Sequence, residues 1–244
     1  MKIIINADGL GLSSGINDGI MYCLKHGLVT STSLFVNADF TADAVSKIKA
    51  TGTTPVGIHL NLTYGKPVLS DVKSLVDYSG RFHYVCSLGF YAKYEDCVRE
   101  LTAQIEKFLS FGLTPTHLDY HHYFHQEQVV FKAYVETAKK YGLPARAFSP
   151  GARAALTKAG VKCTEAFSYD FHDYGVSADT LKGIVEHYNG NVDSVEILTM
   201  PGYMDAHARA QTNYQAREQE IRELAAAHKA GIFKGTELIN FKNL

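Results

Sequence analysis

The chain begins with Met1-Lys2-Ile3-Ile4-Ile5-Asn6-Ala7-Asp8-Gly9, in which a β-branched run, Ile3 to Ala7, stops at an Asp-Gly pair. A short apolar run bounded in this way predicts a strand of a parallel sheet, buried on both faces. Similar strand signals recur along the chain at Val29 to Val36, Val56 to Leu62, Pro144 to Phe148, Ser194 to Met200 and Glu237 to Asn240. The opening strand is therefore the first of a series.

Helix patterns separate these strands. The clearest is Tyr94 to Leu109, where apolar residues recur at helical spacing along one face. Others are centred on Ile16 to Leu24, Thr41 to Ile48, Gln126 to Tyr141, Gly151 to Ala159, Ala178 to Tyr188 and Gln211 to Lys229. Alternation of strands and helices without a linker predicts one parallel α/β domain over residues 1–244, a distorted TIM-like (β/α) barrel with six or seven strands.

Two features qualify this organisation. In residues 64–93 the apolar residues follow neither helical nor strand spacing over any long stretch, and glycines interrupt the segment. This predicts an irregular loop region: a lid, a substrate-binding loop or an inserted surface hairpin. The first strand is followed by Gly9 and Gly11 but lacks the third glycine of a dinucleotide fingerprint. An NAD-type oxidoreductase is therefore the weaker alternative.

The composition is that of an ordinary globular protein. The 244 residues are 46% hydrophobic, and the net charge of −1 gives no electrostatic reason to expect nucleic acid or membrane partners. The four cysteines form no Cys-x-x-Cys pair, and the first residues lack a signal peptide pattern. We therefore expect a cytoplasmic protein, and a homodimer is the first assembly to consider, because two-fold dimers are the commonest soluble oligomers.

A histidine-rich segment, Pro115-Thr116-His117-Leu118-Asp119-Tyr120-His121-His122-Tyr123-Phe124-His125, holds four of the eleven histidines. Its alternation predicts a strand on which Asp119 and His121 point the same way, with His125 four residues further on. Surface histidines or hydrogen-bonded core histidines are the simpler explanation of such a tract. Imidazole and carboxylate crowded at a strand end favour a divalent-metal site instead.

Other polar residues lie at the predicted carboxyl ends of strands, where parallel α/β folds carry their chemistry. They are Asn6, Asp8, Asn37, His59, Asn61, Arg146, Met200 and nearby Asp205. Together with Asp119, His121 and His125 they predict a metal site with open positions for water and substrate. A bound metal polarises a carbonyl and lowers the pKa of water, and a free carboxylate could act as general base, which is the machinery of amide or ester hydrolysis.

The same segments carry a resemblance to a known family. Ile5 to Asp8, His26 to Ser33, Val56 to Thr63 with Gly65 and Pro67, Pro115 to Asp119, His121 to His125, Pro144 to Arg146, and Pro201 to Asp205 occur in the order seen in YdjC-like carbohydrate deacetylases. The resemblance implies a distorted (β/α) barrel, a Mg²⁺ or other divalent ion, and removal of N-acetyl groups from small sugars such as chitooligosaccharides. It implies that His59 and His125 bind the metal, that Asp8 is the catalytic acid/base, and that Asp119, His121, Arg146 and Asn61 support the site or contact substrate.

Two positions depart from the family pattern. The family reads Asn-Ala-Asp-Asp after the first strand, where this chain has Gly9 in place of the second Asp, an expected metal ligand. The late strand ends Thr199-Met200-Pro201-Gly202, where relatives carry a histidine before the proline. A depleted ligand set holds Mg²⁺ weakly and tolerates Zn²⁺ or another transition metal better. The leading hypothesis is thus a metal-dependent hydrolase of C–N amide bonds in carbohydrate metabolism, and the alternative is a catalytically weakened sugar-binding or regulatory member. On the sequence alone, Gly9→Asp is expected to restore a ligand and raise metal affinity.

Overall fold

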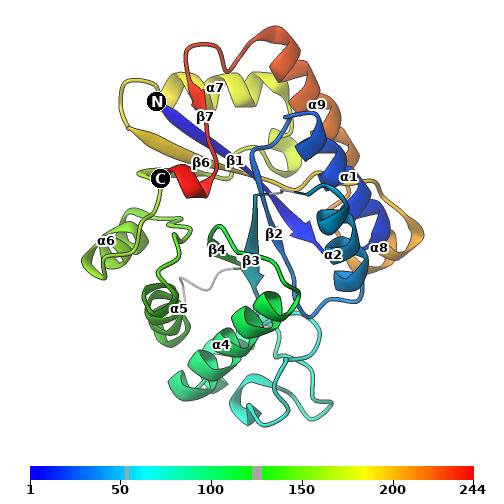
Figure 1. The fold of residues 1–244 in the computed structure, drawn as a ribbon, viewed down its shortest axis with the longest axis vertical. Coiled ribbons are helices and arrows are strands. Elements are labelled where there is room, and N and C mark those ends of the chain that lie inside the picture. The colour runs from blue at the N-terminus through cyan, green and yellow to red at the C-terminus, as the bar shows by residue number, and fades with distance from the viewer. Residues whose placement is uncertain (53–54, 123–127) are drawn as a thin grey trace.

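Strand β1 is the centre of a parallel sheet in the computed structural model, which describes residues 1–52, 55–122 and 128–244 (Figure 1). The strand order is β4 (Leu118–Tyr120), β3 (Val56–Leu60), β2 (Ser31–Leu34), β1 (Lys2–Leu10), β6 (Ser194–Thr199) and β5 (Ala166–Ser168). A short β7 (Glu237–Leu238) pairs with the first residues of β1. The six main strands curve into a half-barrel, and among the described residues β4 and β5 do not pair to close it.

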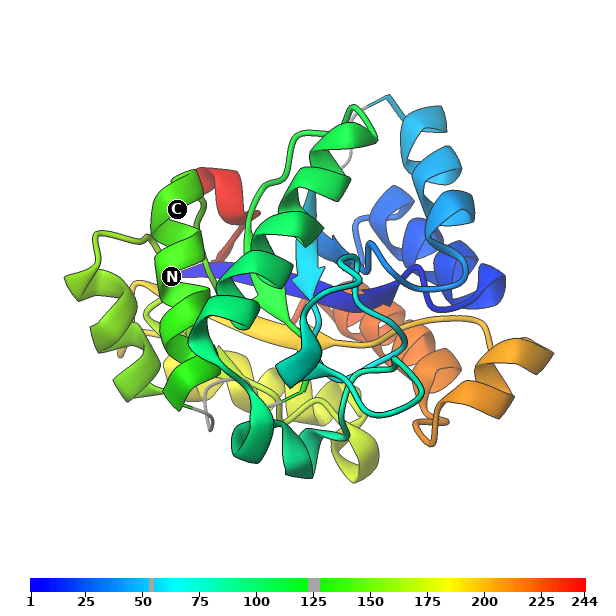
Figure 2. The same ribbon diagram turned by 90° about the horizontal axis from the view of Figure 1, so that it is seen from below.

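Helices surround this sheet, with α1 and α2 on one side and α5 and α6 on the opposite side (Figures 1 and 2). Their bounds are α1 Ser14–Lys25, α2 Thr41–Ala50, α3 Val85–Tyr91, α4 Tyr94–Ser110, α5 Gln128–Tyr141, α6 Pro150–Lys158, α7 Ala178–Tyr188, α8 Ala206–Gln211 and α9 Arg217–Ala230. None of the described helices is long and apolar enough to cross a membrane. The predicted alternation of strands and helices in a parallel α/β fold is confirmed.

The two faces of β1 have different neighbours. Ile3, Ile5 and Ala7 belong to the main hydrophobic core, whereas Ile4 packs with Ile239 and Phe241 from the C-terminal segment. Because side chains alternate along a strand, Asn6 and Asp8 share the face of Ile4. The interior of the half-barrel is therefore apolar near the start of β1 and polar near its end.

Four elements differ from the sequence-based expectation. Pro144 to Phe148 is not a strand and meets β4 only at a single bridge between Leu118 and Ala145, while the unpredicted β5 supplies the sheet edge. The expected helix over Gln211 to Lys229 begins only at Arg217. Gln211 ends α8, Thr212 is extended, and its hydroxyl accepts the N–H of Tyr214, a bond that competes with the helix. The irregular region 64–93 contains α3 and a single 3₁₀ turn.

Candidate active site

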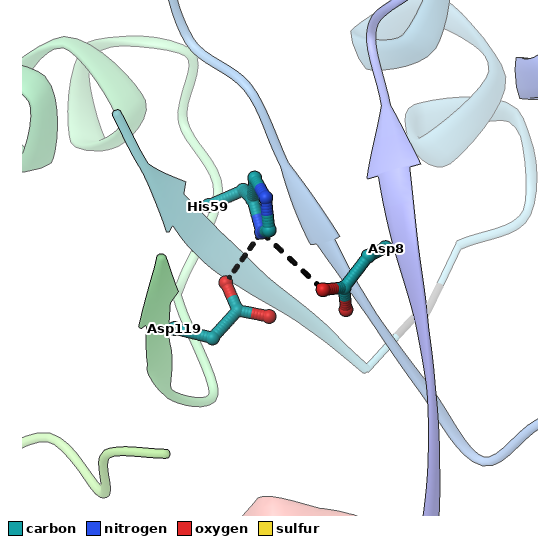
Figure 3. Close-up of side chains that lie close together, drawn as sticks. All are labelled: Asp8, His59 and Asp119. Atoms are coloured by element: carbon teal, nitrogen blue, oxygen red, sulfur yellow. Dashed lines mark hydrogen bonds and ion pairs between the residues drawn. The ribbon is translucent and has the colours of Figure 1, made fainter. Parts of the chain in front are cut away.

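Three strand ends bring Asp8, His59 and Asp119 together inside the half-barrel (Figure 3). The His59 Nδ1 atom lies 2.9 Å from Asp119 Oδ1 and 4.0 Å from Asp8 Oδ2. All three side chains are buried, and one ligand atom from each lies within 4.8 Å of the others. Two carboxylates and an imidazole at this spacing form a possible metal-binding triad.

Sheet register explains why these residues meet. His59 on β3 stands directly beside Asp119 on β4, and Asp8 on β1 stands beside Ser33 on β2. The Ser33 hydroxyl donates to Asp119 Oδ2 at 2.6 Å and also lies 3.1 Å from His59 Nδ1. The Asn6 amide donates to Asp8 at 2.8 Å and to Asp119 at 3.1 Å, so the two carboxylates are held in one hydrogen-bonded network.

Arg146 compensates the negative charge of this cluster. Its Nη1 and Nη2 atoms donate to the two carboxylate oxygens of Asp8 at 2.7 and 2.8 Å, a bidentate pair. Nη2 also lies 3.1 Å from Asp119 and 2.7 Å from Glu196. Burial disfavours the charge of Asp119, but attraction to His59 and Arg146 outweighs it and holds the pKa of Asp119 well below its usual range.

Glu196 on β6 is the third carboxylate around Arg146. Burial raises its pKa to about 7, although the attraction of Arg146 opposes this shift. Near neutral pH Glu196 is thus divided between its two protonation states. Its Oε2 atom has no hydrogen-bond partner among the described residues, which makes Glu196 a buried titratable group directly behind the candidate site.

His121 extends the cluster towards the solvent. Its ring centroid lies 5.6 Å from that of His59 and 3.7 Å from that of His122. Burial and repulsion from His122 and His59 lower the pKa of His121 well below its usual value, so its imidazole is neutral at physiological pH. His125 lies outside the described residues, and its shared coordination with His59 stays a prediction.

A cavity of about 750 Å³ opens over these residues. Its wall includes Asp8, His59, His121 and Arg146 together with a group of aromatic side chains: Phe35, Tyr64, Tyr120, Phe148, Phe167, Tyr169 and Tyr214. The volume is that of a site for a small molecule, and aromatic rings beside a few charged groups suit the apolar faces and hydroxyl edges of a sugar. Polar chemistry and a concave surface thus coincide at the carboxyl ends of the strands.

A family model described as YdjC-like protein matches residues 2–232. The chain belongs to the YdjC-like family. A protein from Clostridium beijerinckii named carbohydrate deacetylase is 37% identical to this chain over 247 residues, with 100% of both chains covered. The crystal structure of an Enterococcus faecalis protein, described as a cellobiose-phosphate cleavage protein, matches with a TM-score of 0.93 at 27% identity over 99% of this chain and 98% of that one. A lactam utilization protein from Thermus thermophilus shares the fold, with a TM-score of 0.59 at 18% identity over 98% and 99% of the two chains.

Not every residue suggested by the YdjC-like resemblance lies in the cavity. Asn61 is buried beside it, where its side chain accepts the backbone N–H groups of Thr63 and Tyr64 and donates to the carbonyl of Tyr64. It therefore shapes the start of the 64–93 region. Of the aromatic residues in that region, Tyr64 alone lines the cavity; Phe82 is buried in the core, and Tyr78, Tyr84, Phe90 and Tyr91 are exposed.

Several residues of the YdjC-like site could not be identified from the sequence. Ser33 and Glu196 contact the cluster, and Arg217 at the start of α9 reaches the cavity beside Gly9. Period-2 strand patterning could have signalled Glu196, a charged residue in an otherwise apolar late strand. No local pattern marks Arg217, because its position depends on the packing of α9 against α1 and α7.

Proposed function

We propose that this protein is a metal-dependent hydrolase that removes an N-acetyl group from a small carbohydrate, such as a chitooligosaccharide. The observation that carries the proposal is the triad of Asp8, His59 and Asp119, of which Asp8 and His59 line an aromatic-walled cavity. Relatives named carbohydrate deacetylase, at 34–37% identity, support the reaction class. The description of the Enterococcus protein adds phosphorylated disaccharides to the candidate substrates.

The donor set suits a divalent ion. His59 and Asp119 would hold it, with His125 proposed as a further ligand through the family resemblance, while Asp8, whose two oxygens both accept from Arg146, is left for proton transfer. Oxygen ligands favour Mg²⁺, and the imidazole admits Zn²⁺ or another transition metal. When bound, such an ion polarises the amide carbonyl and lowers the pKa of a water molecule.

The residues of this chain would supply orientation and proton transfer. Asp8 is proposed to take a proton from the attacking water and to pass it to the leaving nitrogen as the C–N bond breaks, which yields acetate and the free amine. The bidentate Arg146 and the Asn6 amide hold the Asp8 carboxylate in one orientation. The aromatic wall would position the sugar and exclude water from the reacting amide.

The second candidate is a sugar-binding or regulatory protein of the same family. Gly9 and Met200 favour it, because the ligand and the histidine expected from the family pattern are both missing from this chain. In that case the cavity would bind the sugar without releasing acetate.

The deciding experiment pairs metal content with acetate release. Wild-type protein, His59→Ala and His187→Ala would be compared for bound divalent ions and for acetate released from N-acetylglucosamine oligomers. His187 is exposed on α7, so its variant is the matched control. We expect His59→Ala and chelator treatment to abolish both readouts and His187→Ala to leave them unchanged. Acetate release that survives both His59→Ala and chelation would refute the metal dependence, and sugar binding without acetate release under any metal would establish the second candidate.

A further inference from the structure

Arg217 is a buried cation on the wall of the cavity. Its side chain is 3% exposed, yet it belongs to the cavity lining together with Asp8, Gly9 and Met200. Its Nη1 atom donates to the carbonyl of Met200 at 3.0 Å and lies 3.5 Å from that of Asp8. The guanidinium is thereby held at the ends of β6 and β1, beside the candidate reaction centre.

No carboxylate pairs with this guanidinium. Among the described residues no acidic oxygen lies within 4.0 Å of Arg217, and its Nε atom has no hydrogen-bond partner. Arg146, by comparison, contacts three carboxylates in the same half-barrel. An arginine stays protonated even when burial lowers its pKa, as it does here, so a full positive charge is left on the cavity wall.

Glu220, one helical turn further along α9, does not supply the missing charge. One of its carboxyl oxygens accepts the N–H of Met200 at 2.5 Å, and the other is hydrogen-bonded to the Tyr214 hydroxyl. Burial raises the pKa of Glu220 to about 8. At neutral pH it is therefore mostly protonated, and Arg217 has no negative neighbour in contact.

Gly9 keeps the space in front of Arg217 open. A Cβ atom at this position would lie 3.1 and 3.3 Å from the two terminal nitrogens of Arg217. Gly9 also has φ +108, a conformation that side chains rarely adopt. Any acidic side chain here would sit directly on the guanidinium, so the glycine leaves its charge available to a ligand.

We infer that Arg217 is an anion-binding position of the cavity and takes an oxyanion of the carboxylate or phosphate type. Such groups accept charge-assisted hydrogen bonds from a guanidinium and neutralise its buried charge. The oxyanion has two sources: the acyl group that becomes acetate, or an anionic substituent on the sugar. The first of these two sources rests on the proposed function, because only hydrolysis generates acetate in the site.

Anion binding can be measured without turnover. Acetate and inorganic phosphate would be titrated calorimetrically into the full-length protein, with and without chelator, so that binding to a metal ion is recognised. We expect the dissociation constant to rise at least about tenfold in Arg217→Gln, as the loss of a charge-assisted hydrogen bond predicts. Arg222→Gln, an exposed position on the same helix, is the matched control and should bind as wild type. Equal anion affinity in wild type and Arg217→Gln would overturn the inference.

A second pair of variants covers the case in which Arg217→Gln fails to fold. Gly9→Asp and Gly9→Asn impose the same backbone strain, but only the aspartate neutralises the guanidinium. Both side chains fill the space in front of the guanidinium, but we expect a larger loss of anion affinity in Gly9→Asp than in Gly9→Asn, because only the aspartate cancels the charge; equal affinity in both would contradict the inference.

The source of the oxyanion is distinguished by substrate choice. If it is the acyl group, acetate competes with neutral sugars and Arg217→Gln lowers kcat on them. If it is a sugar substituent, a phosphorylated or carboxylated sugar shows at least about tenfold higher kcat/KM than its neutral counterpart, and Arg217→Gln removes that preference. Arg217-dependent anion binding without any acetate release would refute the proposed hydrolysis and leave the anion site standing.

Discussion

Replacing Arg146 with methionine is expected to destabilise the protein more than any comparable surface change. Arg146 contacts Asp8, Asp119 and Glu196 at 2.7–3.1 Å, and all four side chains are buried. Removing one partner of a buried ion pair costs about 3–5 kcal/mol. Because one guanidinium serves three carboxylates, we expect a loss near the upper end of that range.

Two companion variants separate charge from geometry. Arg146→Lys keeps the positive charge but cannot reproduce the bidentate contact with Asp8, so we expect a smaller loss of roughly 1.5–3 kcal/mol. Arg153→Met breaks the partly exposed pair between Arg153 and Glu165 and should cost less than about 1 kcal/mol. The chain has no tryptophan, so urea unfolding would be followed by far-UV circular dichroism.

The pH dependence supplies the refuting result. The pKa of Glu196 is already raised to about 7, so at pH 5 this carboxyl is neutral and no longer needs the guanidinium. The destabilisation caused by Arg146→Met should therefore be smaller at pH 5 than at pH 8. A loss at pH 8 no larger than that of Arg153→Met, or a loss that does not shrink at pH 5, would refute the electrostatic account of Arg146.

Three further predictions follow from single features. Glu220, with its pKa raised to about 8, binds its proton more tightly in the native than in the unfolded protein. Its stabilising effect is therefore complete below about pH 4.5 and is lost as pH rises through 8. Glu220→Gln should flatten the resulting decline of the urea midpoint between pH 5 and 9, and a parallel decline in both proteins would contradict this. Gly57→Ala puts a Cβ atom 2.3 Å from the buried His117 ring and should cost at least about 1–3 kcal/mol by overpacking, measured in the same way; a variant of wild-type stability would show that the ring moves freely. Limited proteolysis should cut first within residues 64–93, because protease cleavage concentrates in irregular exposed segments, and preferential cleavage at 110–130 would contradict this.

The sequence was sufficient for the strands that carry the triad but not for the charges around it. The apolar run that stops at Asp8, the run around His59 and the alternation around Asp119 predict three strands that carry polar residues, and the structure brings these residues together. Strand β5 escaped prediction because its three residues, Ala166 to Ser168, are too few to show a period. The reach of Arg146 to three carboxylates depends on the tertiary arrangement of β1, β4 and β6, which no local pattern encodes.

The expected effect of Gly9→Asp changes once its surroundings are known. From the sequence the aspartate would restore a metal ligand, but the Gly9 backbone has φ +108, and a strained conformation of this kind costs about 1–3 kcal/mol for a residue with a side chain. The Cβ atom of the new side chain would also lie 3.1 Å from the nearest Arg217 nitrogen.

A carboxylate paired with that guanidinium is a poorer ligand than a free one, because the two cations compete for the same oxygens. Gly9→Asp alone should therefore raise metal affinity little, and Gly9→Asp combined with Arg217→Gln should raise it by more than the two single changes added together. Calorimetric metal titration of the wild type, both single variants and the double variant forms the required cycle. If Gly9→Asp alone binds the metal as tightly as the double variant, Arg217 does not compete with the metal for the new carboxylate, and the prediction is wrong.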